Sequence, residues 1–200
     1  MNEEEIKNFI KDKLSEERCF HSICVAEQCE ILASIYGVDV TKARKIGLAH
    51  DIAKELAKEN KLKYAYENNI QIDEVEKIKP GLLHGKIGAD ICKKQFGFNE
   101  EMCNAIACHT TGKKDMNILD KILFVSDATG VDRKWDDTEY VRNLAKQDLD
   151  SAVLYLLDMT IKEKIDKKEL IHIDSILAWN SLVRNRKSEI WHLISDFLDL

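Results

Sequence analysis

Residues 41–55 read TKARKIGLAHDIAKE, and this stretch indicates both the fold class and the candidate chemistry. Apolar or small residues recur at intervals of three and four from Ala43 onward, and His50 continues that series. The spacing predicts an amphipathic helix with Thr41 as its N-terminal cap. A histidine therefore lies on the face that the helix buries, directly before Asp51.

The same helical spacing continues along most of the chain. One proline and eight glycines in 200 residues leave long stretches without a helix-breaking residue. Helices are expected from about residue 6 to 14, from Ser15 to Gly37, over 55–69 with a polar composition, from Leu83 to Gly97, from the cap Asn99 to Ile106, over 119–126, and from Asp137 onward with loops near Asp166 and Asp174. The fold class predicted is all-α.

Charge and hydropathy exclude several classes of partner. The formal net charge of −6 gives no general attraction to nucleic acid or to an anionic membrane surface. No apolar run approaches the roughly 20 residues of a membrane span, and the first residues, MNEEE, are acidic where a signal peptide would be basic. We therefore expect a cytoplasmic protein with no nucleic-acid or membrane partner.

The cysteines show no metal-binding or redox pattern. Their spacing contains no C-x-x-C pair and no Cys/His zinc-finger motif. We interpret them as reduced, mostly buried small side chains. They are Cys19, Cys24, Cys29, Cys92, Cys103 and Cys108.

Four of the six histidines lie on or beside the predicted buried faces of four different helices. A single inward histidine is usually a hydrogen-bonded core residue, and four unrelated core histidines without a metal are the alternative interpretation. Four together with two aspartates instead predict a shared centre whose nitrogen and oxygen donors suit divalent iron, manganese or zinc. The candidate ligands are His21, His50, Asp51, His84, His109 and Asp127.

Adjacent residues such as His50 and Asp51 differ by about 100° around a helix, so both reach one ion only if the helix ends or distorts there. Asp51 could then place one oxygen on each of two ions, an arrangement common in phosphoryl hydrolysis. Arg18, Lys54 and Arg133 could project toward the same cavity, although each of them taken alone is more often a solvated surface charge.

These residues resemble a known pattern. His21, His50-Asp51 and Asp127 match the H…HD…D signature of the HD phosphohydrolase superfamily. The finer resemblance is to the bacterial symmetrical diadenosine tetraphosphate hydrolases of the YqeK group, and it covers about residues 18–133. It is carried by Arg18-x-x-His21, His50-Asp51-Ile52-Ala53-Lys54-Glu55, Leu83-His84-Gly85, and His109-Thr110-Thr111-Gly112 with Met116 following.

The resemblance implies one HD-type hydrolase domain over residues 1–200, with a helical-bundle core at about 15–135 and further C-terminal helices at about 137–200. It also implies a metal centre holding one or two ions, with iron as the ion expected and manganese or another divalent ion as alternatives. His21, His50, Asp51 and Asp127 would be ligands, and His84 and His109 would hold a second ion or face the phosphates.

By the same resemblance, Arg18, Lys54, Thr110 and Arg133 are expected to contact phosphate, with Asp51, Lys54 and Arg133 taking part in catalysis. The segment Ile171-His172-Ile173-Asp174-Ser175 is similar to one that contacts the nucleoside, which makes His172 a candidate substrate-binding residue. His192, beside Trp191, is expected to be structural.

Two departures from the family pattern concern the nucleotide pocket. The family has D-x-x-E-P-x-R after the last ligand, whereas residues 127–133 read DATGVDR, so the glutamate and proline are missing. The family also has proline where Ile173 stands and arginine where Trp179 stands. The lost carboxylate at Gly130 could change the surroundings of the metal or of the nucleotide.

The activity that follows from the resemblance is hydrolysis of a dinucleoside tetraphosphate at its central anhydride, giving two nucleoside diphosphates. The alternatives are an HD hydrolase of another nucleotide, such as a monophosphate or a cyclic dinucleotide, and a noncatalytic nucleotide-binding module. The expected partner is the nucleotide substrate, and a homodimer is left open.

Overall fold

The computed structural model describes the backbone of residues 2–198 and the side chains of residues 2–186. This part of the chain contains no strand, which confirms the predicted all-α fold. Its helices are α1 (Glu3–Lys11), α2 (Glu16–Ile35), α3 (Val40–Ala49), α4 (Lys58–Glu67), α5 (Glu74–Ile78), the 3-10 helix η1 (Pro80–Leu83), α6 (His84–Phe96), α7 (Glu100–Cys108), α8 (Ile118–Thr129), α9 (Thr138–Gln147), α10 (Leu149–Asp166) and α11 (Ile173–Leu198).

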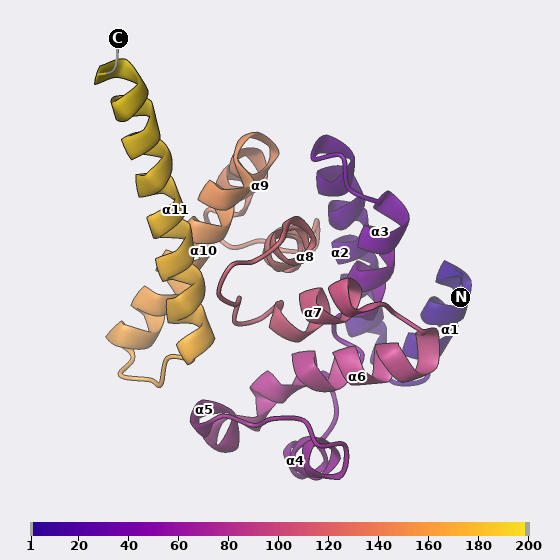
Figure 1. The fold of residues 1–200 in the computed structure, drawn as a ribbon. Helices are drawn as coiled ribbons and strands as arrows, with labels where there is room; N and C mark the ends of the chain where they lie inside the picture. Colours follow the sequence, from indigo (N-terminus) through magenta and orange to yellow (C-terminus); the bar gives the residue numbers. More distant parts are fainter. Residues whose placement is uncertain (1, 199–200) are drawn as a thin grey trace.

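Helix α8 lies at the centre of the molecule (Figure 1). It contacts α2 and α3 on one side, α9 and α10 on another, and α7 on a third. The reason is its composition, because Leu119, Ile122, Leu123 and Val125 expose none of their surface. One connected set of buried apolar side chains extends from Ile6 to Leu182 around this helix.

Helices α2 and α3 pack unusually closely because α3 presents a glycine to α2. A Cβ atom added at Gly47 would lie 2.6 Å from the Cα of Ala26, which is closer than two non-bonded carbon atoms approach in proteins. This close packing brings His21, on α2, beside His50, the residue that ends α3, with ring centroids 5.3 Å apart.

Most predicted helix ends are confirmed, and four need correction. The helix predicted from about residue 6 to 14 lies three residues earlier at both ends, from Glu3 to Lys11, because residues 12–14 turn toward α2. Asp39, and not Thr41, caps α3, because its carboxylate accepts the backbone N–H of Lys42. The predicted helix over 55–69 is shorter, since residues 50–55 form turns and α4 begins only at Lys58. The second C-terminal loop ends before Ile173, where α11 begins, so Asp174 lies within the helix.

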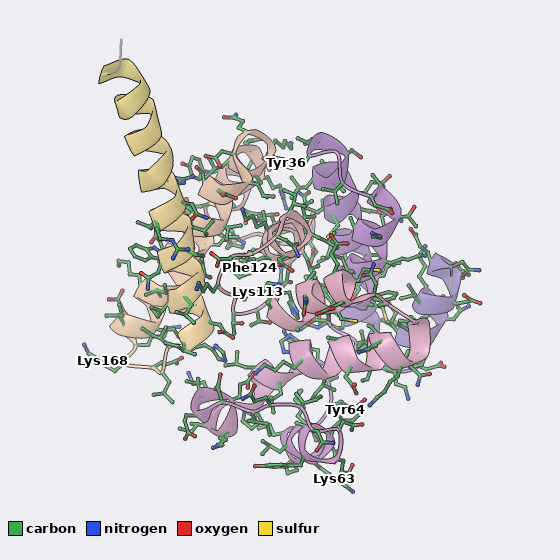
Figure 2. All side chains as sticks on the ribbon, in the orientation of Figure 1. Tyr36, Lys63, Tyr64, Lys113, Phe124 and Lys168 are labelled. Carbon is green, nitrogen blue, oxygen red and sulfur yellow. The ribbon has the colours of Figure 1, made fainter. Side chains whose placement is uncertain are left out.

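Polar side chains join the outer helices to the core. The Tyr36 hydroxyl, at the end of α2, donates to the Ala145 carbonyl of α9 at 2.7 Å, and the Tyr64 hydroxyl of α4 donates to Asp90 of α6 at 2.8 Å (Figure 2). These contacts hold peripheral helices against those that carry the candidate site.

The described cysteines form no disulfide, and four of the six are buried, as predicted. Helix α11 packs along α10, and its C-terminal end extends past the other helices (Figure 1). None of the helices in the described part of the chain combines the length and apolar character needed to cross a membrane. His192 lies outside the residues whose side chains are described.

Candidate metal centre

Three of the four inward histidines lie where a helix ends. His50 follows the last residue of α3, His109 follows the last residue of α7, and His84 follows η1. Carbonyl groups in the last turn of a helix have no partner within the helix. Each of these histidines directs Nδ1 to a carbonyl of that last turn, three residues earlier: the His50, His109 and His84 Nδ1 atoms lie 2.7 Å from the oxygens of Gly47, Ile106 and Gly81, respectively. The oxygens of Ile106 and Gly81 also accept the backbone N–H of the same histidine.

A carbonyl oxygen can only accept a hydrogen bond, so Nδ1 carries the proton in all three rings when they are neutral. The lone pair of each ring is then on Nε2, which points toward the other histidines. His21 shows the same orientation, but its Nδ1 lies 2.7 Å from a carboxylate oxygen of Asp132. The four rings therefore present Nε2 to one buried centre, as the sequence predicted.

Asp127 and Asp51 meet these nitrogens from two sides. Asp127 Oδ1 lies 2.9 Å from Nε2 of His21 and 3.7 Å from Nε2 of His50. Asp51 Oδ2 lies 3.5 Å from Nε2 of His50, whereas its Oδ1 lies 3.1 Å from Nε2 of His84 and 3.6 Å from Nε2 of His109. The two oxygens of Asp51 thus face different groups of histidines.

The donor atoms fit a metal ion better than they fit one another. Nε2 of His84 and Nε2 of His109, both lone-pair atoms in the neutral rings, lie 3.0 Å apart. Nε2 of His50 and Oδ1 of Asp51 are buried and make no hydrogen bond. Because buried acceptors without a donor are costly, this arrangement is suited to a cation between them. His21, His50 and Asp127 form one group that could hold an ion, and His50, Asp51 and His109 form another.

The electrostatics keep the carboxylates charged. Burial acts to raise the pKa of Asp51 and of Asp127, but the neighbouring histidines outweigh it and hold both well below the usual range. Burial lowers the pKa of His84 to about 4, so this ring is neutral at physiological pH. Burial also opposes charge on His109, yet the nearby carboxylates of Asp51 and Asp127 raise its pKa overall.

Three cations border the centre, as expected. Nη1 of Arg18 donates to Asp51 Oδ2 at 3.0 Å. Nζ of Lys54 lies 3.4 Å from Asp51 Oδ1 and 3.1 Å from Nε2 of His84. Nη2 of Arg133 donates to Asp127 Oδ1 at 2.8 Å. Roughly a third of each side chain is exposed, so these cations can meet a ligand as well as the buried carboxylates.

Comparison with known families agrees with this geometry. Residues 18–132, which contain every histidine and aspartate of the centre, match the HD domain. The chain belongs to the HD domain family. The predicted resemblance to this family is thereby confirmed, and HD domains hold divalent metals with such His and Asp clusters.

Two bacterial relatives are similar to the chain over nearly its whole length. The chain is 32% identical to a protein of Halalkalibacterium halodurans over 94% of this chain and 100% of the relative. It is 29% identical to a protein of Bacillus subtilis over 92% of this chain and 98% of that relative. Both relatives are named symmetrical bis(5'-nucleosyl)-tetraphosphatase.

A solved structure has the same fold. It is a protein of Clostridium acetobutylicum described as a predicted HD superfamily hydrolase involved in NAD metabolism. It is 34% identical in sequence, covers 92% of this chain and 98% of its own, and superposes with a TM-score of 0.89. The similarity therefore includes the C-terminal helices beyond the HD match.

A cavity of about 340 Å³ lies beside the HD centre. Thr110 connects the two, because its hydroxyl lies 3.3 Å from Nε2 of His84 and its side chain also lines the cavity. Lys79, Lys164 and His172 are among the other lining residues. The predicted phosphate and nucleoside contacts are thus adjacent in space although far apart in sequence.

His172 is buried, and both of its ring nitrogens face protein groups. Nε2 pairs with the carboxylate of Asp73 and lies 3.8 Å from that of Glu76, and Nδ1 accepts the backbone N–H of Asp174 at 3.2 Å. The ring joins the start of α11 to the start of α5 and is among the residues that line the cavity. Asp73, Glu76 and His172 also form a further group with metal-ligand spacing, away from the histidines of the centre.

Sequence reasoning missed Asp132. It stands next to Arg133 in the segment that departs from the family pattern, and no helical periodicity places it. Its contact with His21 depends on how the turn after α8 folds, so only the tertiary structure reveals it.

Proposed function

We propose that the chain is a metal-dependent hydrolase that cleaves a dinucleoside tetraphosphate, such as diadenosine tetraphosphate, symmetrically into two nucleoside diphosphates. The observation that carries the proposal is the convergence of four Nε2 atoms and two carboxylates in one buried centre bordered by three cations. The names of full-length relatives at 29–32% identity support the choice of substrate.

The proposed ligands are the four histidines and two aspartates of the centre: His21, His50, His84, His109, Asp51 and Asp127. Asp51 is the candidate bridge between two ions, because its oxygens face separate groups of histidines. We favour iron on the strength of the family resemblance, with manganese as the alternative. When bound, divalent ions would supply Lewis acidity, which makes water a better nucleophile and offsets phosphate charge.

The cations of this chain would position the phosphates. Lys54 and Arg18 lie on the Asp51 side of the centre, and Arg133 lies on the Asp127 side. Phosphates held between them would place an inner phosphorus over the centre, and the cations would offset negative charge as the central P–O–P bond breaks. The Thr110 hydroxyl lies close enough to His84 to donate to a phosphate oxygen there.

The cavity beside Thr110 would take one nucleoside. Lys79 and Lys164 at its border are paired with Glu169, at 2.7 and 3.0 Å. We propose that His172 contributes to this part of the site by fixing α11 against α5, in addition to lining the cavity.

We further propose that residues 1–200 form one HD-type domain acting in the cytoplasm. The continuous apolar core from Ile6 to Leu182 supports a single folding unit. The homodimer left open by the sequence remains a prediction, which analytical ultracentrifugation of the purified chain would test.

Hydrolysis in ¹⁸O-labelled water tests the activity. Metal-free protein is loaded with Fe²⁺ under anaerobic conditions, or with Mn²⁺, and given diadenosine tetraphosphate. Cleavage of the central anhydride should give only adenosine diphosphate, with one labelled oxygen in one of every two product molecules. Formation of a triphosphate and a monophosphate would refute symmetrical cleavage, and a metal-loaded protein that releases no product would refute the substrate.

A matched pair of variants distinguishes the centre from general damage. Asp51→Ala should lose metal and turnover together, because it removes both proposed bridging oxygens. Asp136→Ala changes an exposed aspartate three residues after Arg133. This variant should keep both its metal and its turnover. A panel with nucleoside monophosphates and cyclic dinucleotides would identify an HD hydrolase of another nucleotide, and tight binding without product would indicate a noncatalytic module.

A further inference from the structure

The four histidines of the centre are oriented in two different ways. His50, His84 and His109 each direct Nδ1 to a backbone carbonyl in the last turn of a helix. His21 lies within the continuous helix α2, and its Nδ1 faces a side chain instead. The acceptor for its Nδ1–H therefore comes from another part of the chain.

Asp132 is that acceptor. Its Oδ2 lies 2.7 Å from Nδ1 of His21, and its side chain is only 17% exposed. The other oxygen, Oδ1, is buried and makes no hydrogen bond. A buried carboxylate oxygen without a partner destabilises the fold. The contact of the other oxygen with His21 is therefore the interaction that explains why Asp132 lies here.

Gly130 leaves the space that this carboxylate occupies. A Cβ atom at position 130 would lie 2.7 Å from Oδ1 of Asp132. The backbone there has φ −50° and ψ 155°, which any residue adopts, so the glycine is explained by the space and not by its conformation. An added methyl group would therefore displace the Asp132 carboxylate without straining the backbone.

The turn that carries Asp132 is fixed from both ends. The backbone N–H of Arg133 donates to the Gly130 carbonyl at 2.9 Å, and the Arg142 guanidinium donates to the carbonyls of Thr129 and Gly130 at 2.7 and 2.6 Å. Asp132 is consequently held at a defined distance from α2, as a positioning residue must be.

We propose that Asp132 is the positioning residue of His21 and that Gly130 lacks a side chain in order to admit it. By accepting from Nδ1–H, Asp132 would leave the Nε2 lone pair of His21 available to an ion held together with Asp127. The proposal rests on the proposed function only in taking His21 as a metal ligand. Its tautomer can be measured without metal or substrate.

The first test is the tautomer of His21 in the metal-free Asp127→Ala protein, read from the ¹⁵N shifts of Nδ1 and Nε2. This background is needed because Asp127 Oδ1, at 2.9 Å from Nε2, would otherwise compete as the acceptor of the ring proton. The ring should then carry its proton on Nδ1, and adding Asp132→Ala should move the neutral ring toward the Nε2–H form. Asp132→Asn keeps an acceptor oxygen and should retain the Nδ1–H tautomer. An Asp132→Ala protein with unchanged shifts would overturn the proposal, whatever the substrate of the enzyme.

The second test is a double-mutant cycle on Mn²⁺ affinity, measured by calorimetry. Losing an outer partner of a ligand typically weakens metal binding by roughly 10–100-fold. Asp132→Ala and Gly130→Ala should each weaken Mn²⁺ binding by a factor approaching that range. The double variant should bind Mn²⁺ as tightly as Asp132→Ala alone, because the carboxylate that Gly130→Ala would displace is already gone. Asp132→Asn should recover most of the affinity, and Asp136→Ala should match the wild type.

Independent, additive losses from Gly130→Ala and Asp132→Ala would refute the link between the two positions. Wild-type affinity in Asp132→Ala would refute the positioning role itself. Thermal unfolding of the metal-free variants separates either result from misfolding, since each variant should unfold within a few degrees of the wild type.

Discussion

The contact between Gly47 and Ala26 sets the distance between α2 and α3, and Gly47→Ala tests it directly. The new Cβ would lie 2.6 Å from Cα and 2.9 Å from N of Ala26. Both are backbone atoms, which cannot move aside by changing a rotamer. An ordinary contact begins near 3.4 Å, so the helices must separate locally by about 0.8 Å.

The magnitude follows from two opposing terms. Overpacking of this kind costs about 1–3 kcal/mol, and alanine in place of glycine inside a helix returns up to about 1 kcal/mol. We therefore expect a net destabilisation of about 1–2 kcal/mol, or a Tm lowered by roughly 2–8 °C for a chain of this size. Because α2 carries His21 and α3 ends at His50, Mn²⁺ affinity should fall as well.

Differential scanning calorimetry of the metal-free protein and Mn²⁺ titration give the two readouts. Gly81→Ala is the matched control for stability, since its Cβ would meet no atom within 4 Å. If Gly47→Ala raised Tm by the helix-propensity gain alone and bound Mn²⁺ like the wild type, the close helix contact would not determine the geometry of the centre.

Three further outcomes are expected. Lys54→Ala should lower kcat about a hundredfold with nearly unchanged Mn²⁺ content, since the lysine is proposed to stabilise charge that builds during cleavage; an equal loss of metal would assign it to metal binding instead. Metal affinity should fall as pH drops through the raised pKa of His109, because the proton and the metal compete for Nε2; an affinity that rises at lower pH would contradict this assignment. Chelation should lower Tm by roughly 5–10 °C relative to protein with Mn²⁺ at about 100 times Kd, and equal Tm values would show that the centre holds no ion under those conditions.

The helices, and the histidines that they bury, could be predicted from local residue spacing alone. Spacing of three and four residues placed His21, His50, His84 and His109 on inward faces, and all four are at most 4% exposed. These are local properties, because a side chain's position around a helix depends only on the 3.6-residue repeat. The adjacent pair His50-Asp51 also indicated correctly that a helix ends there.

Helix boundaries at caps were less predictable. Thr41 and Asp39 are both competent caps, and the choice of Asp39 depends on how the preceding turn directs its carboxylate toward the Lys42 amide. The shortening of the helix predicted over 55–69 has a similar origin, since turns at residues 50–55 bring Asp51 and Lys54 to the centre.

The distances among the ligands and the partner of each Nδ1 atom depend instead on how the helices pack. Asp132 reaches His21 across 111 positions of sequence because of the turn after α8, and the two oxygens of Asp51 separate two groups of histidines because three helix ends meet there. Such contacts depend on how helices pack, and packing is set by side-chain shapes from distant parts of the chain, which no local pattern encodes.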